Sequence, residues 1–235
     1  VACVDVGAQP AARASGGSQA KEGTDPYVGK VLGGCQLLEK IGHGGMGMVY
    51  KAKQLNLGRT VAVKILSEEL STDATFVRRF LQEARSAAQL NHGNIVHIND
   101  VGESHGTFYF VMELVDGRNL KEILKTTPKL DVAQAIRIAT QVCHALGHAH
   151  SRGVIHRDIK PENIMITADG EVKLADLGLA KRTARESSVH LTQAGAILGT
   201  PYYMAPEQAK DFSRVDHRSD IYSLGVTLYR MLTGK

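Results

Sequence analysis

The sequence is short of cysteine and of long apolar runs, and both shortages restrict what the chain can be. Its three cysteines, Cys3, Cys35 and Cys143, lie far apart and lack the paired spacing of a zinc site. An odd count without a C-x-x-C pair favours a reducing compartment over a disulfide framework. No run reaches the ~18 apolar residues that a membrane helix needs. We therefore expect a cytoplasmic protein with no membrane contact from this segment, although a parent protein could be anchored through a segment after residue 235.

The chain also has little excess charge, and its N-terminal part has few large apolar side chains. The 28 basic and 24 acidic residues leave a formal charge of +4, and they are mixed along the chain. This balance is too weak to indicate nucleic-acid binding, so we expect no nucleic-acid partner. Residues 1–28 lack the basic start and apolar core of a secretory signal. Because they bury too little surface to offset chain entropy, they are predicted to be a disordered leader.

Apolar periodicity divides the rest of the chain into two parts, which indicates an α+β fold. Residues 29–113 predict a small antiparallel sheet with one helix, and residues 114–235 predict a mainly helical part with one hairpin at Asp169-Gly170. The predicted strands are 36–41, 48–53, 60–66, 95–101, 107–114, 164–166 and 171–175, and the predicted helices are 75–90, 120–124, 132–151 and 220–232. The residues predicted on the apolar faces of the two longest C-terminal helices are Ile136, Ala139, Val142, Cys143, Leu146, Ala149, Ile221, Leu224, Leu228 and Met231 or Leu232.

A glycine-rich segment over residues 42–49 has the spacing G-x-G-x-x-G-x-V. Gly42, Gly44, Gly45 and Gly47 would let backbone N–H groups approach phosphate oxygens without interference from Cβ atoms. A dinucleotide-binding fold uses similar glycines, but there a helix follows the third one. Because residues 49–53 predict a strand, we favour a phosphate-binding strand–turn–strand. A plain hairpin turn would not need three glycines at this spacing.

The next predicted strand places a small residue and a cation on the same face. In Val61-Ala62-Val63-Lys64 the side chains alternate, so Ala62 and Lys64 point the same way, as an adenine ring beside a phosphate chain would require. A lysine at a solvated strand edge is the plainer alternative. Glu83 interrupts the apolar stripe of the helix predicted over 75–90, and an unpaired buried carboxylate costs several kcal/mol. A pair with Lys64 would resolve this cost, as would a position at the wet margin of the stripe.

The segment His156-Arg157-Asp158-Ile159-Lys160-Pro161-Glu162-Asn163, followed by Asp176-Leu177-Gly178, has the residues for phosphoryl transfer. Asn163 precedes the first strand of the predicted hairpin and Asp176 follows the second. The ends of an antiparallel hairpin are neighbours, so oxygens of these two residues can share a hard cation such as Mg²⁺. Asp158 lies five residues before Asn163, close enough to orient an incoming hydroxyl.

Together with Ala205-Pro206-Glu207, these motifs occur in the order typical of protein kinases. Over roughly residues 32–235 the chain resembles the bacterial eukaryotic-like (Hanks-type) serine/threonine protein kinase family. The resemblance implies a two-lobed kinase fold with an incomplete C-terminal lobe, and an enzyme that uses ATP with Mg²⁺ or Mn²⁺. It also implies protein substrates phosphorylated on Ser or Thr, and autophosphorylation in a homodimer. The alternatives are a nucleotide-binding pseudokinase or an inactive kinase fragment acting as an interaction module.

The resemblance also implies roles for single residues. Asp158 would steer the proton of the substrate hydroxyl, Lys160 would neutralise the transferring phosphoryl group, and Lys64, paired with Glu83, would bind the α- and β-phosphates. Asn163 and Asp176 would hold the metal. The residues implied to bind the nucleotide are Ile41, Gly42, Gly44, Gly45, Gly47, Val49, Ala62, Lys64, Met112, Glu113, Val115 and Met165.

Activation and support are implied by further positions. Arg157 before Asp158 is typical of kinases switched on by phosphorylation of the activation loop, where Thr192 is the first candidate and Ser187 and Ser188 follow. Thr200 is expected to contact Asp158 and Lys160. Asp220 is expected to brace the backbone of His156-Arg157-Asp158. Because further helices cover the last helix in the family, Leu224 and Leu228 are expected to have an uncovered side here.

Overall fold

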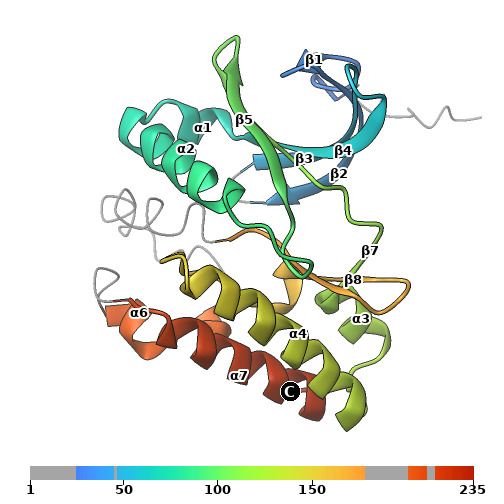
Figure 1. Ribbon diagram of the computed structural model, residues 1–235, viewed down its shortest axis with the longest axis vertical. Coiled ribbons are helices and arrows are strands. Elements are labelled where there is room, and N and C mark those ends of the chain that lie inside the picture. Colours follow the sequence, from blue (N-terminus) through green and yellow to red (C-terminus); the bar gives the residue numbers. More distant parts are fainter. Residues whose placement is uncertain (1–24, 45–46, 178–200, 211–214) are drawn as a thin grey trace, which may run out of the picture.

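The computed structural model describes residues 25–44, 47–177, 201–210 and 215–235, without the side chains of Arg79, Glu83 and Pro201. Gly45, Gly178, Ser187, Ser188, Thr192 and Thr200 therefore lie outside the described residues. The described chain has two halves, an upper sheet with α1 and α2 beside it and a lower helical part (Figure 1). The upper half consists of β1 Val31–Leu32, β2 Cys35–Gly44, β3 Gly47–Gln54, β4 Arg59–Leu66, α1 Glu68–Ser71, α2 Ala74–Ala88, β5 Ile98–Ser104 and β6 Thr107–Met112. The lower half consists of β7 Gly117–Asn119, α3 Leu120–Thr126, α4 Val132–His150, η1 Pro161–Asn163, β8 Ile164–Thr167, β9 Val172–Leu174, η3 Pro201–Tyr203, α6 Pro206–Lys210 and α7 Arg218–Thr233.

The upper sheet is antiparallel, with strand order β1-β2-β3-β4-β6-β5, and it has an apolar core on each face. In β4 the side chains alternate, so Val61, Val63 and Ile65 pack into one cluster while Leu66 joins the core beneath α2. Asp73 caps the N-terminus of helix α2, and its carboxylate accepts hydrogen bonds from two backbone N–H groups of the first turn. This architecture confirms the predicted α+β, two-lobed fold.

Residues 95–97, predicted as the start of a strand, connect the two halves instead. Ile95 forms an isolated bridge with Leu174, and the backbone N–H of Val96 donates to the Leu174 carbonyl at 3.0 Å. In return, Leu174 N–H donates to the Asn94 carbonyl at 2.8 Å. The predicted strand 95–101 is thus wrong in its first half, because this apolar run is buried against the lower hairpin and β5 begins only at Ile98.

Helices α4 and α7 pack side by side in the lower half (Figure 1), and both bury faces that differ in part from the predicted ones. In α4, Ile136 is 53% exposed and Cys143 is also exposed. In α7, Leu224 is buried and Leu228 partly buried, whereas Ile221 is 58% exposed. The expected uncovered side at Leu224 is therefore wrong, because α7 turns this residue toward the core. The buried positions of α4 are Ala135, Ile138, Val142, Ala145, Leu146 and Ala149. Apolar spacing alone predicts the rotation of each helix about its axis only to within about one residue. The packing partner of each helix determines which positions are buried.

The segment predicted as the end of the leader lies against the sheet. The Tyr50 hydroxyl donates to Asp25 Oδ1 at 2.8 Å, and the Tyr27 N–H donates to the same oxygen at 3.0 Å. Burial, and then the bond to Asp25, raises the pKa of Tyr50. Residues 25–28 thus belong with the folded part, because a buried phenol needs a polar partner. No helix among the described residues combines the length and the apolarity that crossing a membrane requires.

Candidate active site

The glycine-rich segment forms the turn end of the β2–β3 hairpin, where Gly42 pairs with Val49 and Gly44 with Gly47. Gly47 has φ +143°, and a Cβ atom there would overlap the carbonyl oxygen of Ile65 in β4. Packing within the sheet therefore requires this glycine. Gly44 is different, because a Cβ atom there would meet nothing within 4 Å. The open space beside Gly44 suits a loop that approaches a ligand.

Lys64 lies in the middle of β4 and points toward the lower half. Its Nζ is 2.6 Å from Asp176 Oδ1, and its side chain is 11% exposed. Burial raises the pKa of Asp176, but the charge and hydrogen bond of Lys64, with the charge of Lys160, lower it below its ordinary value overall. Asp176 is therefore ionised and paired with a cation. The side chain of Glu83 is outside the described residues, so its predicted pair with Lys64 stays a prediction.

Asn163 and Asp176 flank the β8–β9 hairpin. Ala175 N–H donates to the Asn163 carbonyl at 2.9 Å, which holds the two ends together. Asn163 Nδ2 donates to the carbonyl and Oδ2 of Asp158 at 2.8 and 3.2 Å, which leaves its Oδ1 for another partner. An amide oxygen beside a carboxylate is the kind of donor set that Mg²⁺ or Mn²⁺ takes. These residues fit the divalent cation that the sequence predicts.

Asp158, which Asn163 contacts, has two further partners in its own loop. Lys160 Nζ lies 3.0 Å from Asp158 Oδ2, and Asp158 N–H donates to His156 Nδ1 at 3.2 Å. His156 is fully buried, and its Nε2 lies 3.0 Å from the carbonyl of Ala175, next to Asp176. One imidazole thus connects the loop of Asp158 with the segment of Asp176.

Asp220, in the first turn of α7, holds the backbone that precedes Asp158. Its Oδ2 accepts from His156 N–H at 2.9 Å and lies 2.7 Å from His150 Nε2, while its Oδ1 accepts from Arg157 N–H at 2.7 Å. Burial raises the pKa of Asp220, but these hydrogen bonds, that of His150 first, lower it below its ordinary value overall. This is the bracing contact that the resemblance implied.

The predicted adenine-binding residues come from several strands of the upper sheet, from β8 and from the connection after β6. Ala62 is buried and pairs with Met112 across β4 and β6, and Met165 is in β8. Val49 pairs with Lys64 across β3 and β4, and Ile41 in β2 is 47% exposed. Val115 follows in the connection to β7.

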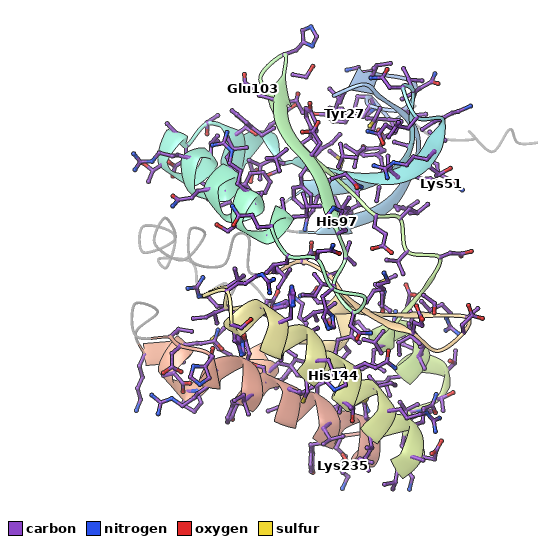
Figure 2. The ribbon with its side chains drawn as sticks, viewed as in Figure 1. Tyr27, Lys51, His97, Glu103, His144 and Lys235 are labelled. Atoms are coloured by element: carbon purple, nitrogen blue, oxygen red, sulfur yellow. The ribbon has the colours of Figure 1, made fainter. Side chains whose placement is uncertain are left out.

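Glu113, between β6 and β7, has protein partners that the sequence did not reveal. Its N–H donates to the His97 carbonyl at 2.9 Å, and its Oε2 accepts from His97 N–H at 3.3 Å. Its Oε1 lies 2.7 Å from Lys173 Nζ in β9. His97 is at the junction of the two halves (Figure 2). Glu113 therefore joins the upper sheet to the lower hairpin. No local pattern could have indicated these partners.

The comparisons with known proteins cover most of this chain. A sequence model of the protein kinase domain matches residues 35–235. The chain is 44% identical to serine/threonine-protein kinase pkn3 of Myxococcus xanthus, a match covering 90% of this chain and 40% of that protein. It is 46% identical to PknB of Mycobacterium leprae, covering 85% and 32%, and 43% identical to PrkC of Bacillus subtilis, covering 88% and 32%. The chain thus spans less than half the length of these relatives. Among solved structures, the kinase domain of Mycobacterium tuberculosis PknI superposes with TM-score 0.73 at 32% identity, covering 88% of this chain and 77% of that one.

Proposed function

The chain belongs to the protein kinase domain family, and we propose that it is the catalytic part of a kinase that transfers the γ-phosphate of ATP to protein serine or threonine. The observation that carries this proposal is that the predicted residues contact one another in two pairs. Lys64 of β4 contacts Asp176, and Asn163 contacts Asp158. The Ala175 N–H, next to Asp176, donates to the Asn163 carbonyl, which joins the two pairs through the ends of the β8–β9 hairpin.

In the proposed reaction, the substrate hydroxyl attacks the γ-phosphorus, the bond to the β–γ bridging oxygen breaks, and ADP leaves. Asp158 orients the hydroxyl and accepts its proton. Lys160, 3.0 Å from Asp158, offsets negative charge on the transferring group. Asn163 and Asp176 would hold Mg²⁺ or Mn²⁺, which when bound neutralises phosphate charge. Lys64 changes partner from Asp176 to the α- and β-phosphates, and Glu83 then pairs with it.

The proposed nucleotide site uses the predicted residues of β2, β3, β4, β6 and β8. Because Glu113 N–H already donates to His97, its carbonyl and the backbone of Val115 are the groups left to bind the adenine edge. Ala62, Met112 and Met165 would contact the ring itself. The glycines from Gly42 to Gly47, Gly45 included, would cover the phosphates together with Ile41 and Val49.

We also propose activation by autophosphorylation at Thr192, with Ser187 and Ser188 as further sites, in a cytoplasmic enzyme that dimerises transiently. A phosphate there would pair with Arg157 through charge-assisted hydrogen bonds. Phosphosite mapping of active protein tests this step. An unmodified segment 183–200 in fully active enzyme would contradict it.

Incubation with Mg²⁺, γ-labelled ATP and casein, followed by phosphoamino-acid analysis, tests the proposed function. We expect label on Ser or Thr, and a loss of about 100-fold or more in Asp158→Asn, since a positioned general base contributes about 100- to 10,000-fold. Equal labelling in both proteins would contradict the role of Asp158. Nucleotide binding without any transfer would instead indicate the pseudokinase or the inactive kinase fragment.

A further inference from the structure

A buried glutamine connects two segments that lie 51 residues apart in sequence. Gln208 in α6 is 2% exposed, although glutamine is usually found at protein surfaces. Its Nε2 donates to the carbonyl of Arg157 at 3.0 Å, and its Oε1 accepts from the N–H of Ala205 at 3.0 Å. Both ends of the amide are therefore bonded, as burial of a polar group requires.

The carbonyl that Gln208 holds belongs to a strained residue. Arg157 has φ +63°, a conformation that non-glycine residues adopt rarely and that the surrounding structure must maintain. Asp220 Oδ1 holds its N–H at 2.7 Å from α7, and Gln208 holds its carbonyl from α6. The peptide group is planar, so fixing this carbonyl also fixes the position of the Asp158 Cα atom.

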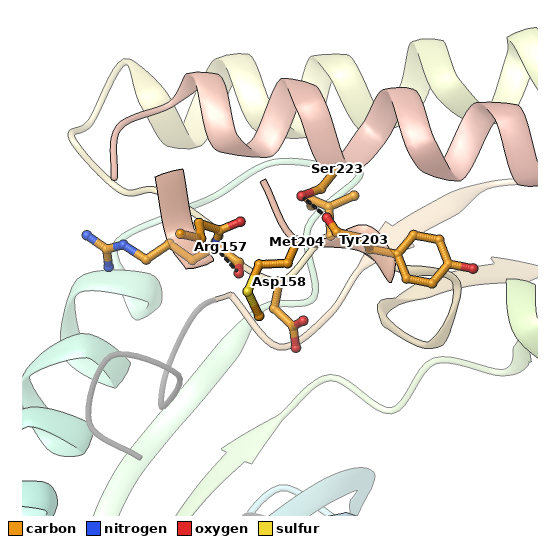
Figure 3. Close-up of a pocket in the computed structure, with 7 residues that line it drawn as sticks. Arg157, Asp158, Tyr203, Met204 and Ser223 are labelled. Carbon is orange, nitrogen blue, oxygen red and sulfur yellow. Dashed lines mark hydrogen bonds between the residues drawn. The ribbon is translucent and has the colours of Figure 1, made fainter. Parts of the chain in front are cut away.

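The other end of the link reaches the segment before α6. The Ser223 hydroxyl donates to the Tyr203 carbonyl at 2.6 Å, which anchors this segment on α7. Figure 3 shows a small cavity where the two segments meet, with Tyr203 and Met204 beside Arg157 and Asp158. The Asp158 carboxylate points away from α7 in this view. The loop that carries Asp158 and the segment 201–208 thus form one packed unit.

We propose that Gln208 is a positioning residue for phosphoryl transfer, an inference that rests on the proposed function. Its amide holds the Arg157–Asp158 peptide in the orientation that presents Asp158 to the substrate hydroxyl. Because the same amide bonds Ala205, this orientation depends on the placement of residues 205–208. The end of the segment that follows the candidate phosphorylation sites is thereby coupled to the catalytic aspartate.

Two substitutions separate this role from simple packing. Gln208→Met keeps the volume and removes both hydrogen bonds, so we expect kcat to fall about 10- to 100-fold while the KM for ATP stays within about twofold. Gln208→Glu can replace both bonds only when protonated, because an ionised carboxylate has no donor for the Arg157 carbonyl. Burial raises the pKa of such a carboxyl, so its activity relative to wild type should fall as the pH rises from about 6 to 8.5. Gln134→Met and Gln134→Glu, at the remote start of α4, are the matched controls and should follow wild type.

The kinetic outcomes are decisive when the wild-type chain is active. Unchanged kcat in Gln208→Met, or a pH profile of Gln208→Glu parallel to wild type, overturns the inference. Hydrogen exchange of the amides of residues 156–158 decides it independently of activity. Faster exchange in Gln208→Met than in Gln134→Met supports the link even if the wild type transfers no phosphate, an outcome that would refute only the proposed function. If Gln208→Met does not fold, the exchange rates of the same amides are measured in Gln208→Glu at pH 6 and pH 8.5. A ratio of variant to wild-type exchange rates that is the same at both pH values overturns the link.

Discussion

Asp220 shows how one buried carboxylate organises a loop more than sixty residues earlier in the chain. It accepts from His156 N–H and Arg157 N–H and contacts His150, yet it is fully buried. A buried charge is stable only when such partners surround it. The three contacts therefore explain why a buried aspartate is tolerated in the first turn of α7, where the helix dipole also stabilises its negative charge.

Asp220→Asn is expected to destabilise the fold by about 2–3 kcal/mol at pH 7, because one backbone donor loses a charged acceptor. The folded pKa of Asp220 lies below its unfolded value, so its contribution is complete above about pH 4–5 and is lost as the pH falls toward the folded pKa. Urea unfolding of both proteins from pH 7 to pH 3 measures this difference. The difference in the free energy of unfolding between the two proteins should become smaller in acid. A difference that does not change with pH would contradict the proposed contribution of the Asp220 charge.

Gly47 and Gly44 have different reasons to be glycine. A Cβ atom at Gly47 would overlap the Ile65 carbonyl, whereas Gly44 has open space around it. We expect Gly47→Ala to lower the free energy of unfolding by about 2–4 kcal/mol. Gly44→Ala should leave stability within about 0.5 kcal/mol and raise the KM for ATP. Denaturant unfolding and ATP kinetics on both variants measure these effects, and equal loss of stability would show that the two glycines share one role.

At the scale of elements, the loop before β5 attaches the upper half to α4 and β9. Asn94 Nδ2 donates to Gln141 Oε1 in α4 at 3.0 Å and to the Val172 carbonyl at 2.9 Å. Gln141 Oε1 also accepts from Val172 N–H at 2.9 Å, and its Nε2 donates to the Gly170 carbonyl at 3.2 Å. Two amides thus connect three elements, next to the backbone bonds between Asn94, Val96 and Leu174.

A double-mutant cycle with Asn94→Ala and Gln141→Ala tests this connection. Each single change is expected to cost about 1–3 kcal/mol, because each leaves backbone groups of the hairpin without a partner. The coupling energy between the two should be about 0.5–3 kcal/mol. Thermal and urea unfolding provide the values, with His144→Ala on the exposed side of α4 as control. Additive single effects would mean that the two amides act separately.

At the scale of the whole molecule, the candidate site lies between two halves that several links hold together. Lys64 and Glu113 come from the upper half, while their partners Asp176 and Lys173 belong to the lower one. A ligand that bonds to both halves adds to these links and stabilises the folded state.

Binding of Mg²⁺ and ATP is therefore expected to raise Tm. At a ligand concentration of 100 times Kd, the free energy of unfolding rises by about 2.7 kcal/mol, which corresponds to a rise in Tm of about 5–10 °C for a chain of this size. ATP with a chelator should give a smaller shift, and Asp176→Asn should remove the dependence on Mg²⁺. Scanning fluorimetry measures Tm under each of these conditions. An equal shift with and without the metal would contradict the proposed role of Asn163 and Asp176.

The order of the motifs, the α+β class and most strands and helices follow from the sequence by itself. Alternation in β4 and the spacing of α2 are local properties, because side-chain direction depends on a few neighbouring residues. The same holds for the hairpin that brings Asn163 and Asp176 together. Residues with the chemistry for phosphoryl transfer were thus recognisable before their positions in space were known.

Contacts between distant segments were decided only by the tertiary structure. The pair of Lys64 with Asp176, the bond of Gln208 to Arg157, and the pair of Glu113 with Lys173 join residues at least 51 positions apart. The tertiary structure also decided the rotation of α4, which leaves Ile136 exposed, and the role of residues 95–97 as a connection between the two halves. Local pattern states which face of an element is apolar, but which partner covers that face depends on the packing of the whole chain.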